Sequence, residues 1–144
     1  MEQLNQQLAI VSVIDPDAYG TGTAAGDVID MALHHRCKFT VLAGDMGQAG
    51  TLDFEVQESA TGVGAWVALA GKAITQLVVG NDDNQAVVEV CDDEMTTATN
   101  QRYLRGVLTI GGNAVDVAVI AEADRCRYKP SSLQDLASVV EIVQ

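Results

Sequence analysis

The stretch TLDFEVQE, residues 51–58, alternates strictly between apolar and polar side chains. Leu52, Phe54 and Val56 fall on one face of an extended chain, and the acidic and amide side chains between them fall on the other. A period of two residues is typical of a β-strand that buries one face and exposes the other. The sequence therefore predicts a strand here that covers one side of a core.

Seven other stretches share this alternation or a continuous apolar character. Short segments rich in Gly, Asn and Asp separate them, such as GDMGQAG (44–50), SATGVG (59–64), GNDDNQ (80–85) and IGGN (110–113), and these residues favour turns. Short strands joined by turns predict an all-β fold, an antiparallel β-sandwich or a barrel-like variant of it, in a single domain. The predicted strands are DVIDMALHH (27–35), CKFTVLAG (37–44), AWVALAG (65–71), AITQLVVG (73–80), AVVEVC (86–91), YLRGVLTIG (103–111) and AVDVAVIAEA (114–123).

The two ends of the chain are predicted to extend beyond this sandwich. Residues 1–14 contain the apolar run LAIVSVI and are expected to form an N-terminal arm. Residues 15–130 form the sandwich domain. Residues 131–144, with the run LASVVEIV, are expected to form a C-terminal arm or a short helix. Both runs are apolar enough to add a strand to a partner or to bury side chains against it.

Composition excludes several classes of function. The 144 residues include 20 Asp and Glu against 8 Lys and Arg, a formal charge of −12, which argues against binding nucleic acid because phosphates need a basic surface. No apolar run approaches the length of a membrane span, and MEQLNQQ does not resemble a signal peptide. We expect a protein folded in a cytoplasm, with neither nucleic acid nor membrane as a partner.

The glycines of AYGTGTAAGDVIDMAL (18–33) raise the question of a dinucleotide site. A dinucleotide fold needs a strand running directly into the glycine turn and then a helix, but the spacing here is GxGxxxG and the sequence that follows alternates like strands. We interpret this stretch as a loop leading into a strand. The sequence predicts no cofactor.

No group of residues predicts catalysis or metal binding. His34 and His35 are adjacent and would point to opposite faces of a strand, so the two rings are poorly placed to share an ion. The acidic segments DPDAYG, NDDNQ and CDDEM lack the alternating ligand spacing of a calcium loop. The serines lie in no nucleophile motif, and no carboxylate pair is distinguished. An enzyme is not expected, and no catalytic or metal-binding residue is predicted.

The cysteines and the basic residues suggest contacts with other chains. Three cysteines, Cys37, Cys91 and Cys126, are widely spaced and odd in number, so intermolecular disulfides are a possible use for them. Five of the eight basic residues fall between Arg102 and Lys129. Arginine and tyrosine are common anchors of interfaces, so we expect this basic segment to face the acidic surface of a neighbouring chain.

Taken together, the segments from about residue 22 to 130 resemble a family of small β-sandwich virion proteins of tailed bacteriophages. The resemblance rests on the glycine turn before residue 27, the strand FTVLAG, a strand ending in QES, the strand RYLRGVLTIGG and the terminal YKP. It implies a capsid decoration (cement) protein of the head, a structural and self-assembling component of the virion. The implied partners are the major capsid protein and like subunits in a homo-oligomer.

Two alternatives remain open at this stage. One is a ring-forming tail tube, tail terminator or neck protein, and the other is a small-ligand or carbohydrate-binding β-sandwich module. For the virion protein, the expected interface comprises Leu8, Ile10, Val11, Val13, Arg102, Arg105, Arg125, Arg127, Tyr128, Leu133, Leu136, Val139 and Val140.

Overall fold

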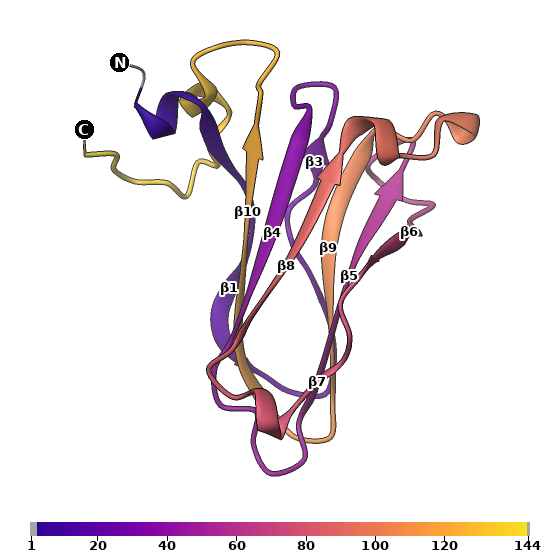
Figure 1. Cartoon of the computed structure of the whole chain (residues 1–144), viewed down its shortest axis with the longest axis vertical. Helices are drawn as coiled ribbons and strands as arrows, with labels where there is room; N and C mark the ends of the chain where they lie inside the picture. Colours follow the sequence, from indigo (N-terminus) through magenta and orange to yellow (C-terminus); the bar gives the residue numbers. More distant parts are fainter. Residues whose placement is uncertain (1–2, 144) are drawn as a thin grey trace.

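The computed structural model describes residues 3–143, which form two facing antiparallel sheets (Figure 1). The first sheet has the strand order β1-β10-β4-β8. It consists of β1 (Leu8–Tyr19), β10 (Val115–Asp124), β4 (Arg36–Ala43) and β8 (Gln85–Cys91). The second has the order β2-β9-β5-β6, with two very short strands at its borders. It consists of β2 (Gly22–Ala25), β9 (Tyr103–Gly111), β5 (Thr51–Ser59) and β6 (Val67–Ala73), with β3 (Ile29–Asp30) on β9 and β7 (Leu77–Val78) on β5. The predicted antiparallel β-sandwich is confirmed.

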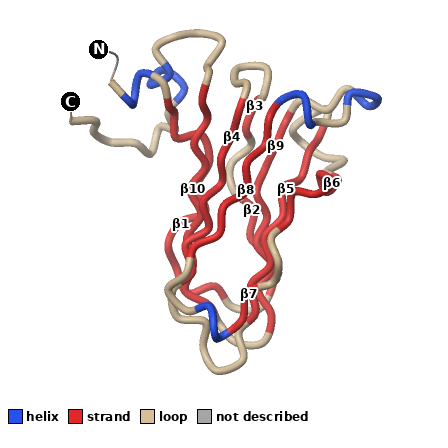
Figure 2. The backbone as a smooth tube through the Cα atoms, in the orientation of Figure 1, coloured by secondary structure: helices blue, strands red, loops and turns tan. Residues whose placement is uncertain are grey.

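In residues 3–143, helical structure is limited to short 3₁₀ segments at the ends of the sandwich (Figure 2). These are η1 (Leu4–Gln6), η2 (Val79–Asn81), η3 (Asp92–Glu94), η4 (Thr97–Thr99) and η5 (Ser131–Gln134). None of the helices in residues 3–143 is long and apolar enough to cross a membrane.

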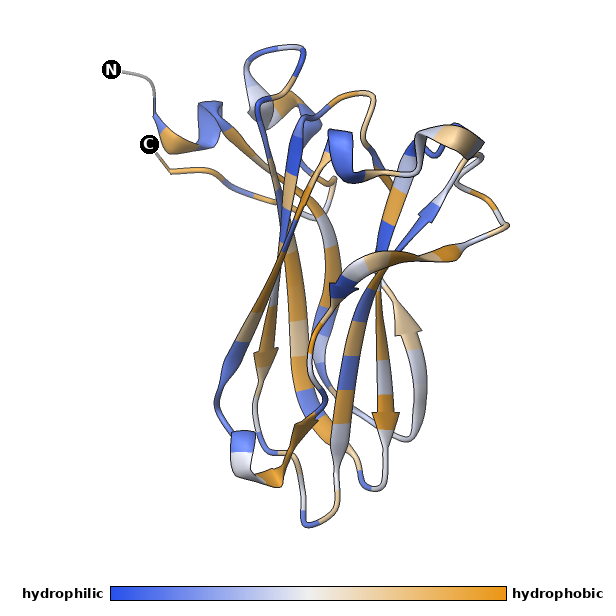
Figure 3. Cartoon of the chain, turned by 45° about the vertical axis from the view of Figure 1, so that its right-hand side comes forward, coloured by the Kyte–Doolittle hydropathy of each residue, from blue (hydrophilic) through white to orange (hydrophobic). Residues whose placement is uncertain are grey.

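The core lies between the inward faces of the two sheets. In β4 and β5 every second side chain is buried, as the alternating sequence predicts, and Figure 3 shows apolar and polar residues alternating along the strands. Phe39 from β4 and Phe54 from β5 meet across the sheets with ring centroids 5.6 Å apart. Gly106 faces both rings, and a Cβ there would lie 2.7 Å from the Phe54 ring, so glycine makes room for the pair.

The N-terminal segment corrects the prediction of a free arm over residues 1–14. Residues 8–14 begin β1, which pairs with β10 from Leu8 to Tyr19. Ala9, Val11 and Ile14 are buried in the core. The run LAIVSVI is therefore part of the sandwich because its apolar side chains fill the space beside β10; residues 1 and 2 lie outside the described residues.

Two other predicted elements are shorter than expected. Of DVIDMALHH, only Ile29 and Asp30 pair with β9, and the chain then turns through residues 31–34. Of AITQLVVG, Ala73 ends β6 and only Leu77 and Val78 form a further strand. In the glycine stretch, Gly20 and Thr21 connect β1 to β2, and β2 begins at Gly22.

Candidate interaction surface at the chain termini

Both termini lie at the same end of the sandwich (Figure 1). Ser131 Oγ donates a hydrogen bond of 2.9 Å to the carbonyl oxygen of Gln7. The amide of Ile10 donates to Asp135 Oδ1 at 2.7 Å, and the amide of Leu136 donates to the Ile10 carbonyl at 2.9 Å. The C-terminal segment is thereby fixed against β1, an edge strand of the first sheet. We call residues 3–10 and 131–143 the terminal surface.

Apolar side chains are concentrated and exposed on this surface. Val140 is 96% exposed, and Leu4, Leu133, Ile142 and Val143 are also exposed. A groove of about 410 Å³ lies between the two segments, and Leu8, Ile10 and Val139 contribute to its lining. Isolated exposed apolar residues are ordinary on proteins, but a contiguous group around a groove is typical of a surface that contacts another molecule.

The predicted interface residues at the chain ends separate into two groups. Leu133 and Val140 are exposed, and Leu136 and Val139 are half-buried, with Val139 lining the groove. In β1, Leu8, Ile10 and Val13 are half-buried within the sheet. Val11 is buried in the core, so including it in an interface was wrong. The C-terminal segment beyond residue 134 forms neither a helix nor a strand up to residue 143.

The predicted basic segment is divided between different parts of the molecule. Arg102 and Arg105 lie in or beside β9 of the second sheet, whereas Arg125, Arg127 and the exposed Tyr128 follow β10 of the first. Three of the arginines have partners within the chain. Arg102 binds Asp30 through two nitrogens, Arg127 binds Asp92 at 3.0 Å, and Arg105 donates to Gln57.

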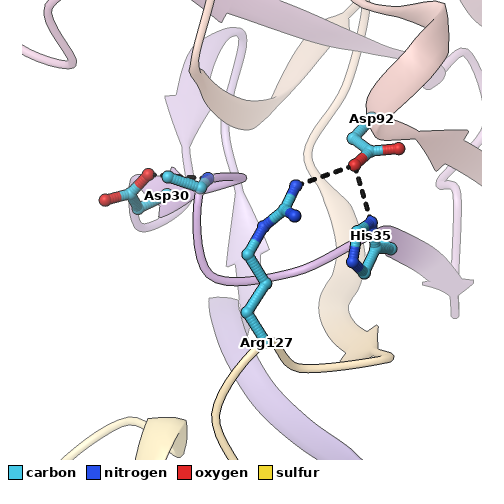
Figure 4. A network of polar contacts seen from close by, with 5 residues as sticks. Asp30, His35, Asp92 and Arg127 are labelled. Atoms are coloured by element: carbon cyan, nitrogen blue, oxygen red, sulfur yellow. Dashed lines mark hydrogen bonds and ion pairs between the residues drawn. The ribbon is translucent and has the colours of Figure 1, made fainter.

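The Arg127–Asp92 contact belongs to a small polar network (Figure 4). Asp92 Oδ2 also contacts His35 Nδ1 at 2.8 Å, so one carboxylate joins the start of β4 to the loop after β10. Sequence reasoning missed Asp30 and Asp92 as partners because each lies dozens of residues from its arginine. These contacts join neighbouring strands and loops within each sheet, and they leave the arginines less free to bind a neighbour than we expected.

The Asp30–Arg102 pair predicts a dependence of stability on pH. The hydrogen bond from Arg102 lowers the pKa of the Asp30 carboxyl below its ordinary 3.8. A lowered pKa stabilises the fold above the unfolded-state pKa, and the stabilisation is lost as the pH falls through the folded-state pKa. We expect the free energy of unfolding to fall less between pH 7 and about pH 3 in Asp30→Asn than in the parent. Urea unfolding at both pH values measures this, and equal pH dependence of the two proteins would contradict the assignment.

None of the three cysteines forms a disulfide within the chain, and their positions limit intermolecular disulfides. Cys37 is buried in the core, so the prediction that it cross-links chains was wrong for the folded protein. Cys126 is buried beside His34, whose Nδ1 lies 3.1 Å from the sulfur. Cys91 is half-buried at the end of β8. His34 and His35 do point to different partners, Cys126 and Asp92, and residues 3–143 contain no group of three residues suited to a metal ion.

The single tryptophan bears on the carbohydrate alternative. The Arg105 guanidinium lies over the Trp66 ring, 4.4 Å from its centroid. Sugar rings bind to the open face of an aromatic side chain, and here a cation covers one face. Trp66 is thus engaged in packing within the second sheet.

Comparison with known proteins adds information on the fold. No family model matches the sequence, and no curated protein matches it. Among solved structures, the PBSX exported protein XepA superposes with a TM-score of 0.57 at 16% identity, over 89% of this chain and 40% of XepA. The chain therefore spans well under half the length of XepA. The likeness to XepA supports the β-sandwich fold.

Two further structures have weaker likeness. A carbohydrate-binding module, CBM28, specific for non-crystalline cellulose, has a TM-score of 0.48 at 12% identity, over 78% of this chain and 73% of the module. The structure of Triatoma virus has a TM-score of 0.49 at 6% identity, over 88% of this chain and 68% of the viral chain.

Proposed function

We propose that this chain is a structural protein of a tailed-phage virion that decorates the head shell and stabilises it as a cement protein. The terminal surface is the observation that carries the proposal. It presents exposed apolar side chains at one end of a rigid sandwich, among them Leu133 and Val140. The exposed Val143 also lines the groove of this surface. The sequence resemblance to phage head proteins supports the same role, as does the sandwich fold.

The expected partners are the major capsid protein and further copies of this chain. Burying one valine or leucine side chain contributes about 1.5–3 kcal/mol, so a single terminal surface would bind weakly after the loss of rotational freedom. A shell repeats the same site many times. If copies also contact one another, the effective concentration of linked sites raises avidity by roughly 10²–10⁴. Small contacts can then hold a shell together.

Substituting Val140 tests the terminal surface. Val140→Asp places a charge where the interface is expected to be dry, and we expect binding to shells to weaken by about 10-fold or more. The matched control is Val63→Asp, because Val63 is 91% exposed in the loop between β5 and β6 and carries the same change in charge. Co-sedimentation of each variant with phage heads assembled without this protein measures binding. An equal loss of shell binding in both variants, or no loss of binding in either variant, would contradict the proposed surface.

Light scattering of the purified protein distinguishes the alternatives. A small oligomer agrees with a decoration protein, whereas a large ring or tube would favour a tail tube, tail terminator or neck protein. A monomer that binds neither shells nor itself would favour a ligand-binding module. Repeating the measurement with reductant tests whether Cys91, the least buried of the three cysteines, links chains.

A further inference from the structure

Cys126 and His34 form a buried thiol–imidazole pair that the structural role does not require. His34 is 2% exposed and lies in the turn before β4, and Cys126 is 8% exposed in the loop after β10. The sulfur and Nδ1 are 3.1 Å apart. A nucleophile with a base at hydrogen-bond distance is the arrangement that activates cysteine side chains.

The surroundings of His34 favour its neutral form. Burial lowers the pKa of the imidazole, against a smaller opposing effect of Asp30. A neutral ring offers one nitrogen as a proton acceptor, and Nδ1 is the nitrogen that faces the sulfur. His34 is therefore placed to take the thiol proton when Cys126 reacts.

Cys126 also reaches a cavity with a basic lining. The cavity has a volume of about 460 Å³, and its lining includes Arg36, Arg125, Lys129 and the single acid Asp124. Asp124 is ion-paired with Arg36, so Arg125 and Lys129 account for the excess of positive charge in the lining. A local excess of positive charge is notable on a chain with a net charge of −12. Positive surroundings attract anionic reactants.

The other two cysteines have the opposite environment. Burial raises the pKa of the Cys37 thiol. The pKa of Cys91 is raised by burial and by the nearby carboxylates Glu94, Asp93 and Glu89. Reactive cysteines in proteins have basic, partly accessible surroundings, and among the three only Cys126 combines a base with a basic cavity.

We propose that Cys126 is a modification site for small anionic disulfides of the glutathione type, with His34 as the base. The Cys126 thiolate attacks one sulfur of the disulfide, and a new sulfur–sulfur bond forms as the original one breaks. The second half of the disulfide leaves as a thiolate and takes up the proton that His34 removed. Cys126 is oxidised to a mixed disulfide, and the released half is reduced to a free thiol.

Thiol labelling of the full chain tests the site. The Cys91→Ser variant lacks the half-buried thiol. Any thiol that reacts in the folded variant is therefore Cys126 or the deeply buried Cys37. The probes are dithiobis(nitrobenzoate), which is dianionic, and dithiodipyridine, which is neutral. We expect one labelled thiol per native chain, located at Cys126 by peptide mass spectrometry. Labelling only after unfolding, or at Cys37 first, would overturn the proposal.

Two variants in this background separate the roles of base and charge. His34→Gln is expected to slow both probes by on the order of 10-fold or more. Arg125→Gln is expected to slow the dianionic probe by roughly threefold to tenfold and leave the neutral probe unchanged, and Arg105→Gln, outside the cavity, should change neither. If His34→Gln does not fold, the rates of the two probes in Arg125→Gln still test the proposed site. An unchanged ratio of the two probe rates in Arg125→Gln would overturn the basic cavity as the recognition site.

Discussion

Deletion of residues 1–14 is expected to unfold the domain. The deletion removes the first half of β1, including the buried side chains of Ala9, Val11 and Ile14 and the pairing with β10. Burial of a valine or isoleucine side chain contributes about 1.5–3 kcal/mol, and the deletion also uncovers the core behind them. The total is comparable with the roughly 5–15 kcal/mol that stabilises an ordinary domain.

The matched control is deletion of residues 137–144 from the other end. Within residues 137–143 every side chain is exposed except the half-buried Val139, so this protein should keep a cooperative unfolding transition close to that of the parent. Circular dichroism and urea unfolding of the two truncated proteins measure the difference. A folded protein lacking residues 1–14, with the parent's midpoint, would show that β1 is dispensable.

Phe39→Ala is expected to lower the free energy of unfolding by about 3–5 kcal/mol. Phe39 is 1% exposed and contacts Phe54 from the opposite sheet, so removing its ring opens a cavity at the junction of the two sheets. Gly106 beside the pair has no side chain to fill the space. The loss should therefore lie near the upper end of the range for large-to-small substitutions in protein cores.

Urea unfolding measures the effect of this substitution. The midpoint should fall while the dependence of the free energy on urea concentration stays unchanged. The control is Val87→Ala on the outer face of β8, because Val87 is exposed and its truncation should change stability by less than about 0.5 kcal/mol. Similar losses in the two variants would mean that the ring pair contributes no more than an outer-face contact.

The fold was largely predictable from sequence, and the main error has a physical cause. β4, β5, β9 and β10 show the period of two because each has one face on the core. β1 does not, since irregularities in its register between Ile10 and Ser12 and between Ile14 and Asp17 interrupt the alternation. The run LAIVSVI is almost continuously apolar and lacks a period of two. Its pairing with β10, more than 100 residues away, therefore could not be predicted from its own sequence.

The site was predictable in part for a related reason. The apolar C-terminal run predicted apolar side chains outside the core, and Leu133 and Val140 are exposed; their contact with a partner stays a prediction. The partners of Arg102, Arg127 and Cys126 were not predictable, because each lies far away in the sequence. The separations are 72 positions for Asp30, 35 for Asp92 and 92 for His34, and only the fold brings these residues together. The basic residues are close together in the sequence, but the fold places them on two different sheets.

The way in which the strand edges are closed limits how copies of this chain can meet. On β1, Asp135 and Leu136 occupy both hydrogen-bonding groups of Ile10, and on β8 the Lys72 ammonium occupies the Glu89 carbonyl. Neither edge offers an uninterrupted row of backbone donors and acceptors to a neighbour's strand. Molecules crowded together at high concentration would thus not extend the first sheet from one copy to the next, and contacts on that side of the sandwich would form through side chains.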